Sequence, residues 1–423
     1  MHMKDKILKI ALKVIEEIKG RNIIKKVITK KKDTLKIGER TYPLRPVKVI
    51  AVGKASIEMT KGIMDEIGGL IEEALVISPY YEELQGAEVI LGSHPYPDER
   101  SLRAGEKLQE FAARIKEGDL VIFLISGGAS ALAEVPLKPF SIKDIKTITR
   151  GLLKAGADIE EINTVRRHLS AIKGGRLAEK IFPAELITIA ISDVKFDVPY
   201  DIGSGPTVGD PTTVLQAANL LLKYGFEEYA KIVKKLPETP KPGDNIFKNT
   251  HFHIAANTLH ALSIAKKEAG KEGIRTLLLT AEDEGEAREV AKIYSAVMHE
   301  IKRSHNPASP PILLLSGGEL TVTVKGEGKG GRNTELVLAM LLELKKFQGD
   351  FVVLSIGTDG QDGPTDAAGA FFNKEIYEKI GDSSPEDYLN NNDSYSFFEK
   401  VGGLIFTGPT GTNVRDIRFF YVQ

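Results

Sequence analysis

Short runs of hydrophobic residues alternate with longer segments of helical periodicity along most of the chain. The runs that predict strands in the first half are Val47–Val52, Ala74–Ser78, Val89–Leu91, Leu120–Ile125 and Leu186–Ile191. Segments with apolar residues at helical spacing lie between them, including Ser101–Lys116 and Ser141–Lys154. This alternation is typical of α/β layers built on mainly parallel sheets.

The alternation starts again after a stretch rich in Lys and Pro. Strands are predicted at Phe252–Ala255, Thr276–Thr280, Ile312–Leu315, Thr321–Lys325 and Phe351–Ile356, and helices at Ala287–Lys302 and Thr334–Lys345. Asp210 followed by Pro211 predicts the capped start of another helix. Leu236–Asp244 contains three prolines and one glycine, so we expect two α/β domains, 1–240 and 241–423. Which domain the first ~40 residues pack on is left open.

Composition excludes several classes of protein. Lys and Arg number 57 against 58 Asp and Glu, which leaves no basic field for nucleic acid or anionic lipid. With no cysteine in 423 residues, disulfides, zinc-thiolate sites and iron–sulfur clusters are excluded. No apolar run approaches the ~20 residues of a membrane helix, and we expect a cytoplasmic protein. The absence of Trp beside many Lys and Glu is typical of thermophile proteins.

A glycine-rich turn follows the most apolar of the predicted strands. Gly127-Gly128-Ala129-Ser130 lies between that strand and a predicted helix, where backbone N–H groups can surround an anion. The alternative is a tight turn that needs glycine for backbone reasons alone. Leu124–Gly128 and Leu314–Gly318 have nearly the same sequence, so each domain is expected to carry one glycine-rich ligand loop.

A second glycine-rich segment carries positive charge. Gly326, Gly328 and Gly331 match the G-x-G-x-x-G spacing, but the preceding residues alternate like a half-exposed hairpin strand. Lys325, Lys329 and Arg332 are interleaved with these glycines, an arrangement that suits polyphosphate. The alternative is a flexible, solvated hairpin loop.

Acidic and basic side chains follow several predicted strands. Gly357–Asp366 holds three aspartates after one strand, and Asp193 follows another. Carboxylates of this kind bind Mg²⁺, although a polar turn would use aspartate in the same way. Lys54 and His94 also follow strands, at positions where α/β proteins carry ligand-binding groups.

Taken in order, these segments resemble the class II glycerate 2-kinases, whose C-terminal domain is called the MOFRL domain. The resemblance rests on the motifs His94–Asp98, Ser126–Ser130, Asn163–Ser170 with Lys173–Gly175, Ser192–Val194, Gly203–Thr207, Ser316–Glu319, Gly331–Glu335, Gly357–Asp366 and Gly408–Val414. They span most of the chain, and none is broken.

The resemblance implies a kinase that uses ATP and Mg²⁺ to convert D-glycerate to 2-phosphoglycerate. It implies a Rossmann-like N-terminal domain, a MOFRL-type C-terminal domain and an active-site cleft between the two. The family's functional positions fall on Lys54, Asp193, Arg332 and Asp359. Lys54 and Arg332 would neutralise phosphate charge, while Asp193 and Asp359 would share the roles of base and metal ligand. Which aspartate has which role is left open.

Two further groups of residues are expected to hold the substrates. The residues expected to hold the glycerate carboxylate are Ser126, Gly127, Gly128, Ala129 and Ser130, with His94 and Arg166 as further candidates. The expected nucleotide-binding residues are Ser316, Gly317, Gly318, Glu319, Lys329, Gly330 and Gly331. A homodimer is expected from base rates.

Two other functions are weighed against the kinase. Homologues have carried the label hydroxypyruvate reductase, an enzyme that would use NAD(P)H. That function needs a buried parallel strand running into G-x-G-x-x-G, which the pattern before Gly326 does not favour. A non-catalytic sensor of small molecules would need an effector module, and no DNA-binding segment or charged tail is evident.

Overall fold

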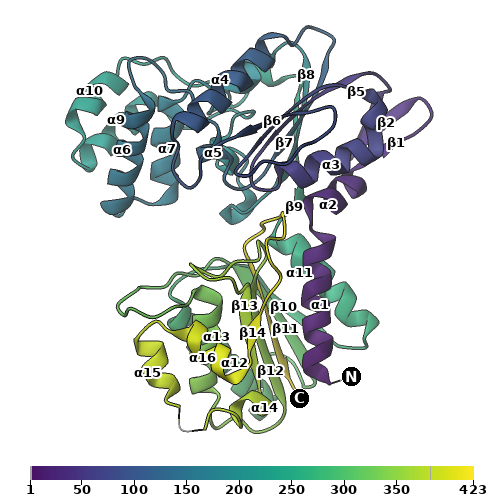
Figure 1. Cartoon of the computed structure of the whole chain (residues 1–423), viewed down its shortest axis with the longest axis vertical. Helices are drawn as coiled ribbons and strands as arrows, with labels where there is room; N and C mark the ends of the chain where they lie inside the picture. The colour runs from purple at the N-terminus through teal and green to yellow at the C-terminus, as the bar shows by residue number, and fades with distance from the viewer. Residues whose placement is uncertain (1, 382) are drawn as a thin grey trace. The chain divides into compact units, whose positions relative to one another are not determined.

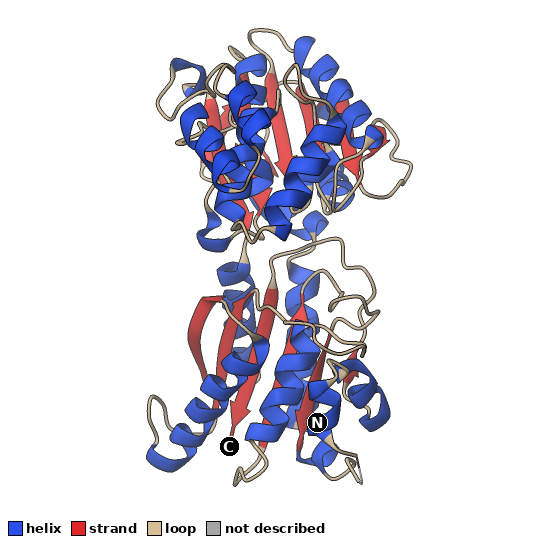
Figure 2. Ribbon diagram, turned by 90° about the vertical axis from the view of Figure 1, so that its left-hand side faces the viewer, coloured by secondary structure: helices blue, strands red, loops and turns tan. Residues whose placement is uncertain are grey.

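The computed structural model describes residues 2–381 and 383–423, and the chain divides into two compact units. The N-terminal unit is Gly20–Ala255, and the C-terminal unit combines Met1–Lys19 with Ala256–Gln423. Each unit contains a six-stranded sheet with helices on both sides (Figures 1 and 2). The α/β class predicted from the sequence is therefore confirmed.

The large sheet of the N-terminal unit has the strand order β6-β5-β4-β7-β8-β9. Its strands are Glu88–Leu91 (β6), Ile71–Ser78 (β5), Val47–Val52 (β4), Leu120–Ile125 (β7), Glu185–Ile191 (β8) and Thr250–Ala256 (β9). The pairs from β6 through β8 are parallel. Every residue of β7 is buried, as expected for a central strand covered on both faces. Parallel pairing brings the carboxyl ends of β4, β7 and β8 to one edge of this sheet.

Helices of the N-terminal unit form two layers and a separate bundle. Their bounds are Gly20–Val27 (α2), Ser56–Ile67 (α3), Glu99–Ala113 (α4), Ala129–Leu132 (α5), Ile142–Lys154 (α6), Ile159–Leu169 (α7), Arg176–Ile181 (α8), Val214–Lys223 (α9) and Glu227–Val233 (α10). Helices α4 and α8 share a core with the sheet, while α6, α7, α9 and α10 bury their apolar faces against one another. A small antiparallel sheet, Ile28–Lys30 (β1), Thr34–Ile37 (β2) and Arg40–Pro43 (β3), completes the unit.

The sheet of the C-terminal unit is mixed rather than mainly parallel. Its order is Thr276–Asp283 (β10), Ile312–Gly318 (β11), Asp416–Val422 (β15), Phe351–Gly357 (β12), Gly369–Asn373 (β13) and Leu404–Ile405 (β14). Only β10 and β11 pair in parallel. Strand β15, which the sequence analysis did not predict, lies between β11 and β12 and runs antiparallel to both. Hydrophobic runs predict that strands exist but do not fix their direction, and the expectation of parallel pairing fails here for that reason.

Helices cover both faces of this second sheet. They are Met3–Glu17 (α1), Thr258–Lys271 (α11), Ala287–Ser304 (α12), Arg332–Glu343 (α13), Lys374–Tyr377 (α14), Pro385–Asn390 (α15) and Ser394–Val401 (α16). Helices α12, α13 and α16 share a core with β11, β12 and β15. Helix α1, purple in Figure 1, packs on α11 and β12. The first 19 residues thus belong to the C-terminal unit, whereas the chain from Gly20 belongs to the N-terminal one.

Three local expectations differ from the structure. The division after Ala255 replaces the boundary predicted at 240/241, because β9 is an edge strand of the N-terminal sheet. Thr321–Lys325 forms no strand beyond an isolated bridge at Thr321. Asp210 caps no helix: α9 begins at Val214 with Thr213 as its cap, and Asp210 is completely buried.

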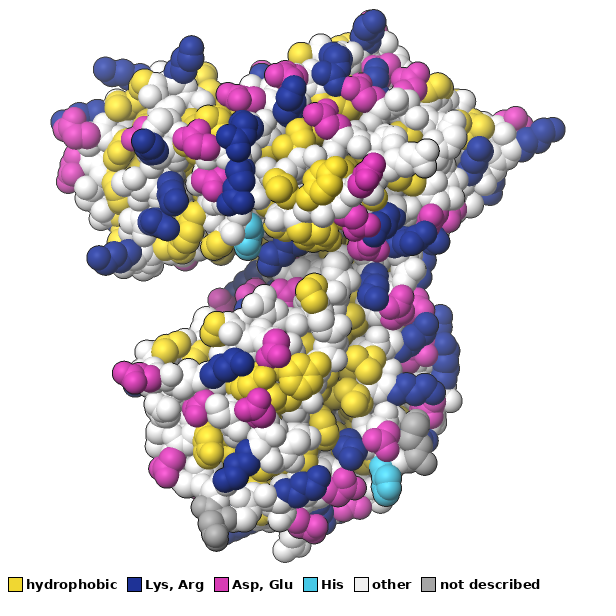
Figure 3. All heavy atoms as spheres, in the orientation of Figure 1, with side chains coloured by type: hydrophobic (Ala, Val, Ile, Leu, Met, Phe, Trp, Pro, Cys, Tyr) yellow, Lys and Arg dark blue, Asp and Glu magenta, His cyan; other side chains and the backbone are white. Residues whose placement is uncertain are grey.

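Charged side chains of both signs are mixed on the surface. On the face drawn in Figure 3, Lys and Arg alternate with Asp and Glu without a large patch of one sign. Within the described ranges, no helix combines the length and apolar character needed to cross a membrane.

Candidate active site

The carboxyl ends of β4 and β7 are joined by backbone hydrogen bonds. Ser126 donates its N–H to the Val52 carbonyl at 3.1 Å, and Lys54 donates its N–H to the Gly127 carbonyl at 2.9 Å. The Ala55 N–H donates to Ser126 Oγ at 3.0 Å. These bonds hold the Lys54 turn against the glycine-rich loop at the edge where ligands bind in parallel α/β sheets.

Glycines in this loop allow three functional side chains to approach the backbone. A Cβ placed on Gly127 would lie 2.0 Å from Asp193 Oδ2, and one on Gly128 would lie 3.0 Å from His94 Cδ2 and 3.4 Å from Lys54 Cγ. The carboxylate, the imidazole and the lysine stem therefore all lie against the Gly127-Gly128 backbone. Three of the residues predicted from separate motifs are thus brought together within one unit.

Electrostatics make His94 a neutral group in this cluster. Partial burial and, secondarily, the positive charge of Lys54 lower the pKa of His94 to about 4. The side chain is nevertheless solvent-accessible, so a ligand can reach it. A neutral imidazole can donate one hydrogen bond and accept another without adding charge.

Arg166, the remaining predicted glycerate-binding residue, is tied to a different group. Burial lowers its pKa, while the nearby Glu134 carboxylate and Tyr96 oppose that effect. Glu134 also forms an ion pair with Lys173, and both of these side chains are 2% exposed. Arg166 therefore interacts with a buried pair of charges, Glu134 and Lys173, of which Glu134 comes two residues after the end of α5.

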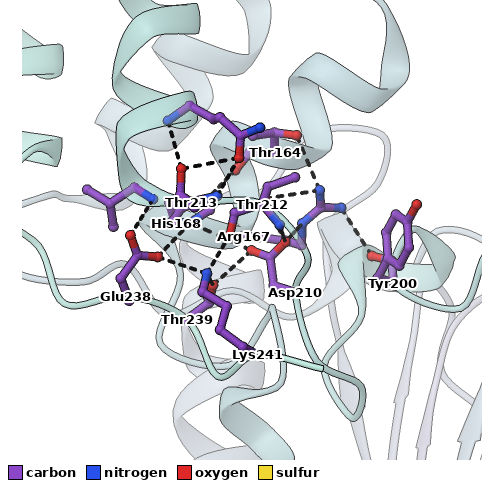
Figure 4. A network of polar contacts seen from close by, with 12 residues as sticks. Thr164, Arg167, His168, Tyr200, Asp210, Thr212, Thr213, Glu238, Thr239 and Lys241 are labelled. Atoms are coloured by element: carbon purple, nitrogen blue, oxygen red, sulfur yellow. Dashed lines mark hydrogen bonds and ion pairs between the residues drawn. The ribbon is translucent and has the colours of Figure 1, made fainter. Parts of the chain in front are cut away.

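A buried network centred on Asp210 supports α7 (Figure 4). Asp210 accepts hydrogen bonds from the Thr212 N–H at 2.9 Å and Thr239 Oγ1 at 3.0 Å. Its Oδ1 also lies 2.9 Å from Arg167 Nε. The sequence analysis singled out the α7 motif but missed this role of Asp210. Its only signal was the pairing with Pro211, which suggested a helix cap.

In the C-terminal unit, Arg332 begins α13 and is held by two carboxylates. Its Nε and Nη2 donate to the two oxygens of Asp416 at 2.7 and 3.1 Å, and its Nη1 donates to Glu319. Burial alone would lower the pKa of Arg332, but Asp416 and Glu319 outweigh it and raise the pKa. The bidentate contact fixes the plane of the guanidinium.

Behind Arg332 lies a second buried network that the sequence analysis missed. Arg418 donates to Asp416 at 3.2 Å and to Asp283 at 2.7 Å. Asp283 also accepts hydrogen bonds from Ser316 and Tyr294. Two charged residues in the last strand gave no hint of burial, because sequence reasoning places unpaired charges at the surface.

The predicted loop at Ser316-Gly317-Gly318 is the end of strand β11 instead. All three residues are buried and paired with β15. A Cβ on Gly317 would lie 2.5 Å from Thr258 Cγ2, and one on Gly318 would lie 2.3 Å from the Asp283 nitrogen. These glycines serve close packing between elements, and only Glu319, which follows them, is exposed.

Much of the Gly326–Gly331 backbone is already hydrogen-bonded to protein. The N–H groups of Lys325 and Gly326 donate to Asn392 Oδ1, and the Lys329 N–H donates to Asp393 Oδ1 at 2.9 Å. The Gly331 N–H donates to Thr334 Oγ1 at 3.0 Å. Lys329 Nζ lies 3.7 Å from the centre of the Tyr395 ring. Its Nζ also lies 3.8 Å from Asp366 Oδ1, and the Lys329 side chain is 47% exposed. A phosphate can therefore contact this cation more readily than the loop backbone.

The three aspartates of Gly357–Asp366 have separate environments. Asp362 is completely buried and accepts the N–H groups of Asn333 and Thr334, each at 2.8 Å, so it caps α13. Asp366 is exposed and accepts a hydrogen bond from Tyr395. Asp359 is half-buried at the end of β12, where its Oδ1 accepts the Gln361 N–H at 3.1 Å. Among the described residues, no three His, Asp or Glu side chains form a metal-binding group.

Comparison with known proteins gives consistent matches along the chain. Residues 6–237 match a family described as a domain of unknown function (DUF4147), and residues 312–416 match the MOFRL family. A D-glycerate 2-kinase of Thermotoga maritima is 39% identical over 397 residues, covering 90% of this chain and 94% of that protein. A glycerate 2-kinase of Pyrococcus horikoshii is 40% identical over 384 residues, covering 88% and 86%.

Other similarities concern a different name and a solved structure. A protein of Agrobacterium vitis named putative hydroxypyruvate reductase is 38% identical over 379 residues, covering 88% of this chain and 86% of that protein. The crystal structure of a glycerate kinase from Thermotoga maritima superimposes with a TM-score of 0.90 at 36% identity. That match covers 100% of this chain and 99% of the other.

Proposed function

The chain belongs to the class II glycerate kinase family, and we propose that it transfers the γ-phosphoryl group of ATP to the C2 hydroxyl of D-glycerate, with Mg²⁺. The products are 2-phosphoglycerate and ADP. The observation that carries this proposal is the gathering of Lys54, His94 and Asp193 at Gly127 and Gly128. The cation and the carboxylate are groups that phosphoryl transfer to an alcohol uses, and the neutral imidazole adds a hydrogen-bonding group for the substrate.

Asp193 is the proposed acceptor of the hydroxyl proton. The C2 oxygen attacks the γ-phosphorus, the bond from that phosphorus to the ADP oxygen breaks, and the proton passes to the Asp193 carboxylate. Lys54 stabilises the negative charge of the phosphoryl group during transfer. The Ser126–Ser130 loop, with His94 and Arg166, binds glycerate.

Arg332 is proposed to act on the nucleotide phosphates. Its bidentate contact with the buried Asp416 orients the guanidinium, while its third contact is with the exposed Glu319. A phosphate oxygen can replace an exposed carboxylate at Nη1 without disturbing the buried pair. Lys329, whose ammonium is exposed, is the second cation proposed for the nucleotide.

The residues present fit Mg²⁺ bound mainly through nucleotide phosphates. Mg²⁺ takes oxygen ligands, usually one or two carboxylates with phosphate oxygens and waters. Asp359 is the carboxylate proposed to hold it, which leaves Asp193 for the proton. When bound, the ion would neutralise part of the phosphate charge.

The reductase alternative finds less support in the fold. A dinucleotide fingerprint needs a parallel strand ahead of its glycines and free N–H groups at the helix start. Thr321–Lys325 forms no such strand, and Asp362 accepts the N–H groups of Asn333 and Thr334 in the first turn of α13. The carboxylate of Asp362 thus occupies the position that a pyrophosphate would need.

Phosphorus NMR of the purified protein with ATP, Mg²⁺ and D-glycerate tests the proposal. The expected result is 2-phosphoglycerate with an equal amount of ADP, and no product from Lys54→Met prepared in parallel. That variant excludes a contaminating kinase as the source. A 3-phosphoglycerate signal would overturn the proposed acceptor hydroxyl, and no turnover by folded protein would overturn the kinase assignment.

A further inference from the structure

A series of hydrogen bonds runs from Ser130 in α5, directly after the Gly127-Gly128 turn, into the core of the N-terminal unit. Ser130 Oγ and Ser204 Oγ are 2.8 Å apart, and Ser204 Oγ is 3.3 Å from Asn163 Oδ1. The Asn163 amide Nδ2 in turn lies 3.2 Å from Asp201 Oδ1. Three segments distant in sequence, α5, α7 and the turn before Gly205, are linked in this way.

The Asp201 carboxylate, at one end of this series of hydrogen bonds, determines which group donates in each of them. The Asp201 carboxylate can only accept, so Asn163 donates through Nδ2 and presents Oδ1 as an acceptor. Ser204 has one hydroxyl proton and donates it to Asn163 Oδ1. The Ser130–Ser204 contact then requires Ser130 to be the donor. The hydroxyl proton of Ser130 is therefore used in the hydrogen bond that it donates to Ser204.

Buried ion pairs hold the far end of this series in place. Arg167 Nη1 donates to Asp201 Oδ1 at 2.8 Å, and Arg167 Nε lies 2.9 Å from Asp210 Oδ1. Arg167 and Asp210 belong to the network drawn in Figure 4. Arg167 and Ser204 are almost completely buried. Reversal of these hydrogen bonds would place the Asn163 carbonyl oxygen against the Asp201 carboxylate, and neither group has a proton to donate.

Ser130 can therefore offer a ligand only the lone pairs of its hydroxyl oxygen. Ser130 is half-buried, so part of the residue is exposed. A carboxylate has no proton to donate to it. In the proposed reaction the C2 hydroxyl of glycerate gives its proton to Asp193. The C3 hydroxyl is then the group of glycerate that can donate a hydrogen bond to Ser130.

We propose that Ser130 accepts a hydrogen bond from the C3 hydroxyl of glycerate and thereby selects 2,3-dihydroxy acids over 2-hydroxy acids that end in a methyl group. This inference rests on the proposed function. It assigns Ser130 to hydroxyl recognition rather than to the glycerate carboxylate. An analogue without the hydroxyl leaves the serine lone pairs without a donor, which a built hydrogen-bonding site penalises.

Calorimetric titration with D-glycerate and D-lactate, which differ only in the C3 hydroxyl, tests this role. The wild-type protein should bind D-glycerate about tenfold more tightly than D-lactate. Ser130→Ala should reduce that ratio to about one, by weakening glycerate binding while leaving lactate binding nearly unchanged. Ser130→Cys, a poor acceptor of similar size, should do the same, so misfolding of one variant leaves the other as a test.

Ser56→Ala is the control, because it removes a different serine hydroxyl of the same unit, one that is buried and bonded to the Ile77 carbonyl at 3.0 Å. It should leave the glycerate-to-lactate ratio unchanged. If the Ser130 variants reduce the affinity for D-glycerate and for D-lactate equally, or reduce neither, the hydroxyl-acceptor role is wrong while the kinase proposal stands. If the wild-type protein binds no glycerate, the kinase proposal and this inference are both overturned.

Discussion

The proposed roles of Asp193 and Lys54 depend on their contacts with residues that are distant in sequence. Asp193 and Lys54 come from different strands, yet both contact the glycine pair at 127 and 128. A side chain at Gly127 would overlap the Asp193 carboxylate, so the glycine serves this contact as well as the turn. From the sequence, Gly127 could equally have been a simple turn residue.

Lys54→Met is expected to lower the turnover number roughly a thousandfold, because the phosphoryl group loses a cation in the transition state. The substitution should also raise the pKa of His94 above about 4, since the charge of Lys54 contributes to lowering it. Burial, the larger cause, remains, so the pKa should stay below its ordinary value. Steady-state kinetics and an NMR titration of the imidazole measure the two effects.

Lys48→Met provides the control for that experiment. Lys48 lies on the same strand, β4, where it pairs with Asp119. Loss of this pair should leave both the turnover number and the pKa of His94 unchanged. Near-normal turnover in folded Lys54→Met would remove Lys54 from the proposed mechanism.

At the level of elements, helix α13 depends on a carboxylate from another loop. Asp362 accepts two backbone N–H groups at its start and the Thr334 hydroxyl at 2.7 Å. From pattern alone the sequence analysis treated Gly357–Asp366 as one acidic run that could bind Mg²⁺, and only the family resemblance named Asp359. Spacing along a loop does not reveal which carboxylate turns inward, and only packing against α13 separates the two.

Asp362→Asn is therefore expected to destabilise the protein by about 1–3 kcal/mol, because an amide offers one acceptor oxygen where the carboxylate offers two. Urea denaturation measures the change. Asp366→Asn, at an exposed position of the same loop, should change the free energy of unfolding by less than about 0.5 kcal/mol. Equal stability of the two variants would contradict the capping role.

The packing of α7 makes stability depend on pH through His168. Burial, above all, lowers the pKa of His168 from its ordinary 6.5, and Nδ1 lies 2.9 Å from the Thr164 carbonyl. Below about pH 6.5 the unfolded chain binds a proton that the folded state does not. The stabilisation is thus complete above that pH and decreases as the pH falls.

Unfolding midpoints in urea should accordingly drop between about pH 7.5 and about pH 5.5, and His168→Gln should flatten part of that slope. His94, whose pKa is also lowered, contributes in the same direction, so the slope should not vanish. An unchanged slope in His168→Gln would show that the buried imidazole does not cause it.

For the whole molecule, the two units contribute different chemistry. The N-terminal unit gathers a lysine, a histidine and a carboxylate at its sheet edge, and the C-terminal unit holds Arg332 in a buried charge network. A kinase binds ATP in its folded state only, and such a ligand stabilises the protein by mass action. The expected stabilisation is about 2.7 kcal/mol at a hundredfold excess over the dissociation constant.

Thermal unfolding with and without ligand is the corresponding measurement. ATP with Mg²⁺ should raise the melting temperature, whereas NADH at the same concentration should leave it unchanged. The reverse pattern would favour the reductase. Arg332→Ala should weaken the response to ATP, since the proposed phosphate-binding guanidinium is lost.

Much of the fold could be predicted from hydrophobic pattern alone. The predicted bounds of β4 and β7 equal those observed, and most other predicted strands differ by a few residues at their ends. Strands β4 and β7 are almost wholly buried, and burial on both faces makes them continuous apolar runs. Strand β15 was missed because Asp416 and Arg418 interrupt its apolar pattern, and their burial depends on partners in other strands.

The sequence by itself determined the α/β class, the main strands and the residue types of the chemistry, because periodicity and local motifs act over short stretches of chain. Tertiary structure decided the rest: the antiparallel course of β15, the packing of α1 on the C-terminal unit and the inward role of Asp210. It also decided that Ser130 donates its proton inward, since that direction is imposed by Asp201, which is remote in sequence. Such facts depend on which groups meet in space, and one-dimensional spacing does not contain that information.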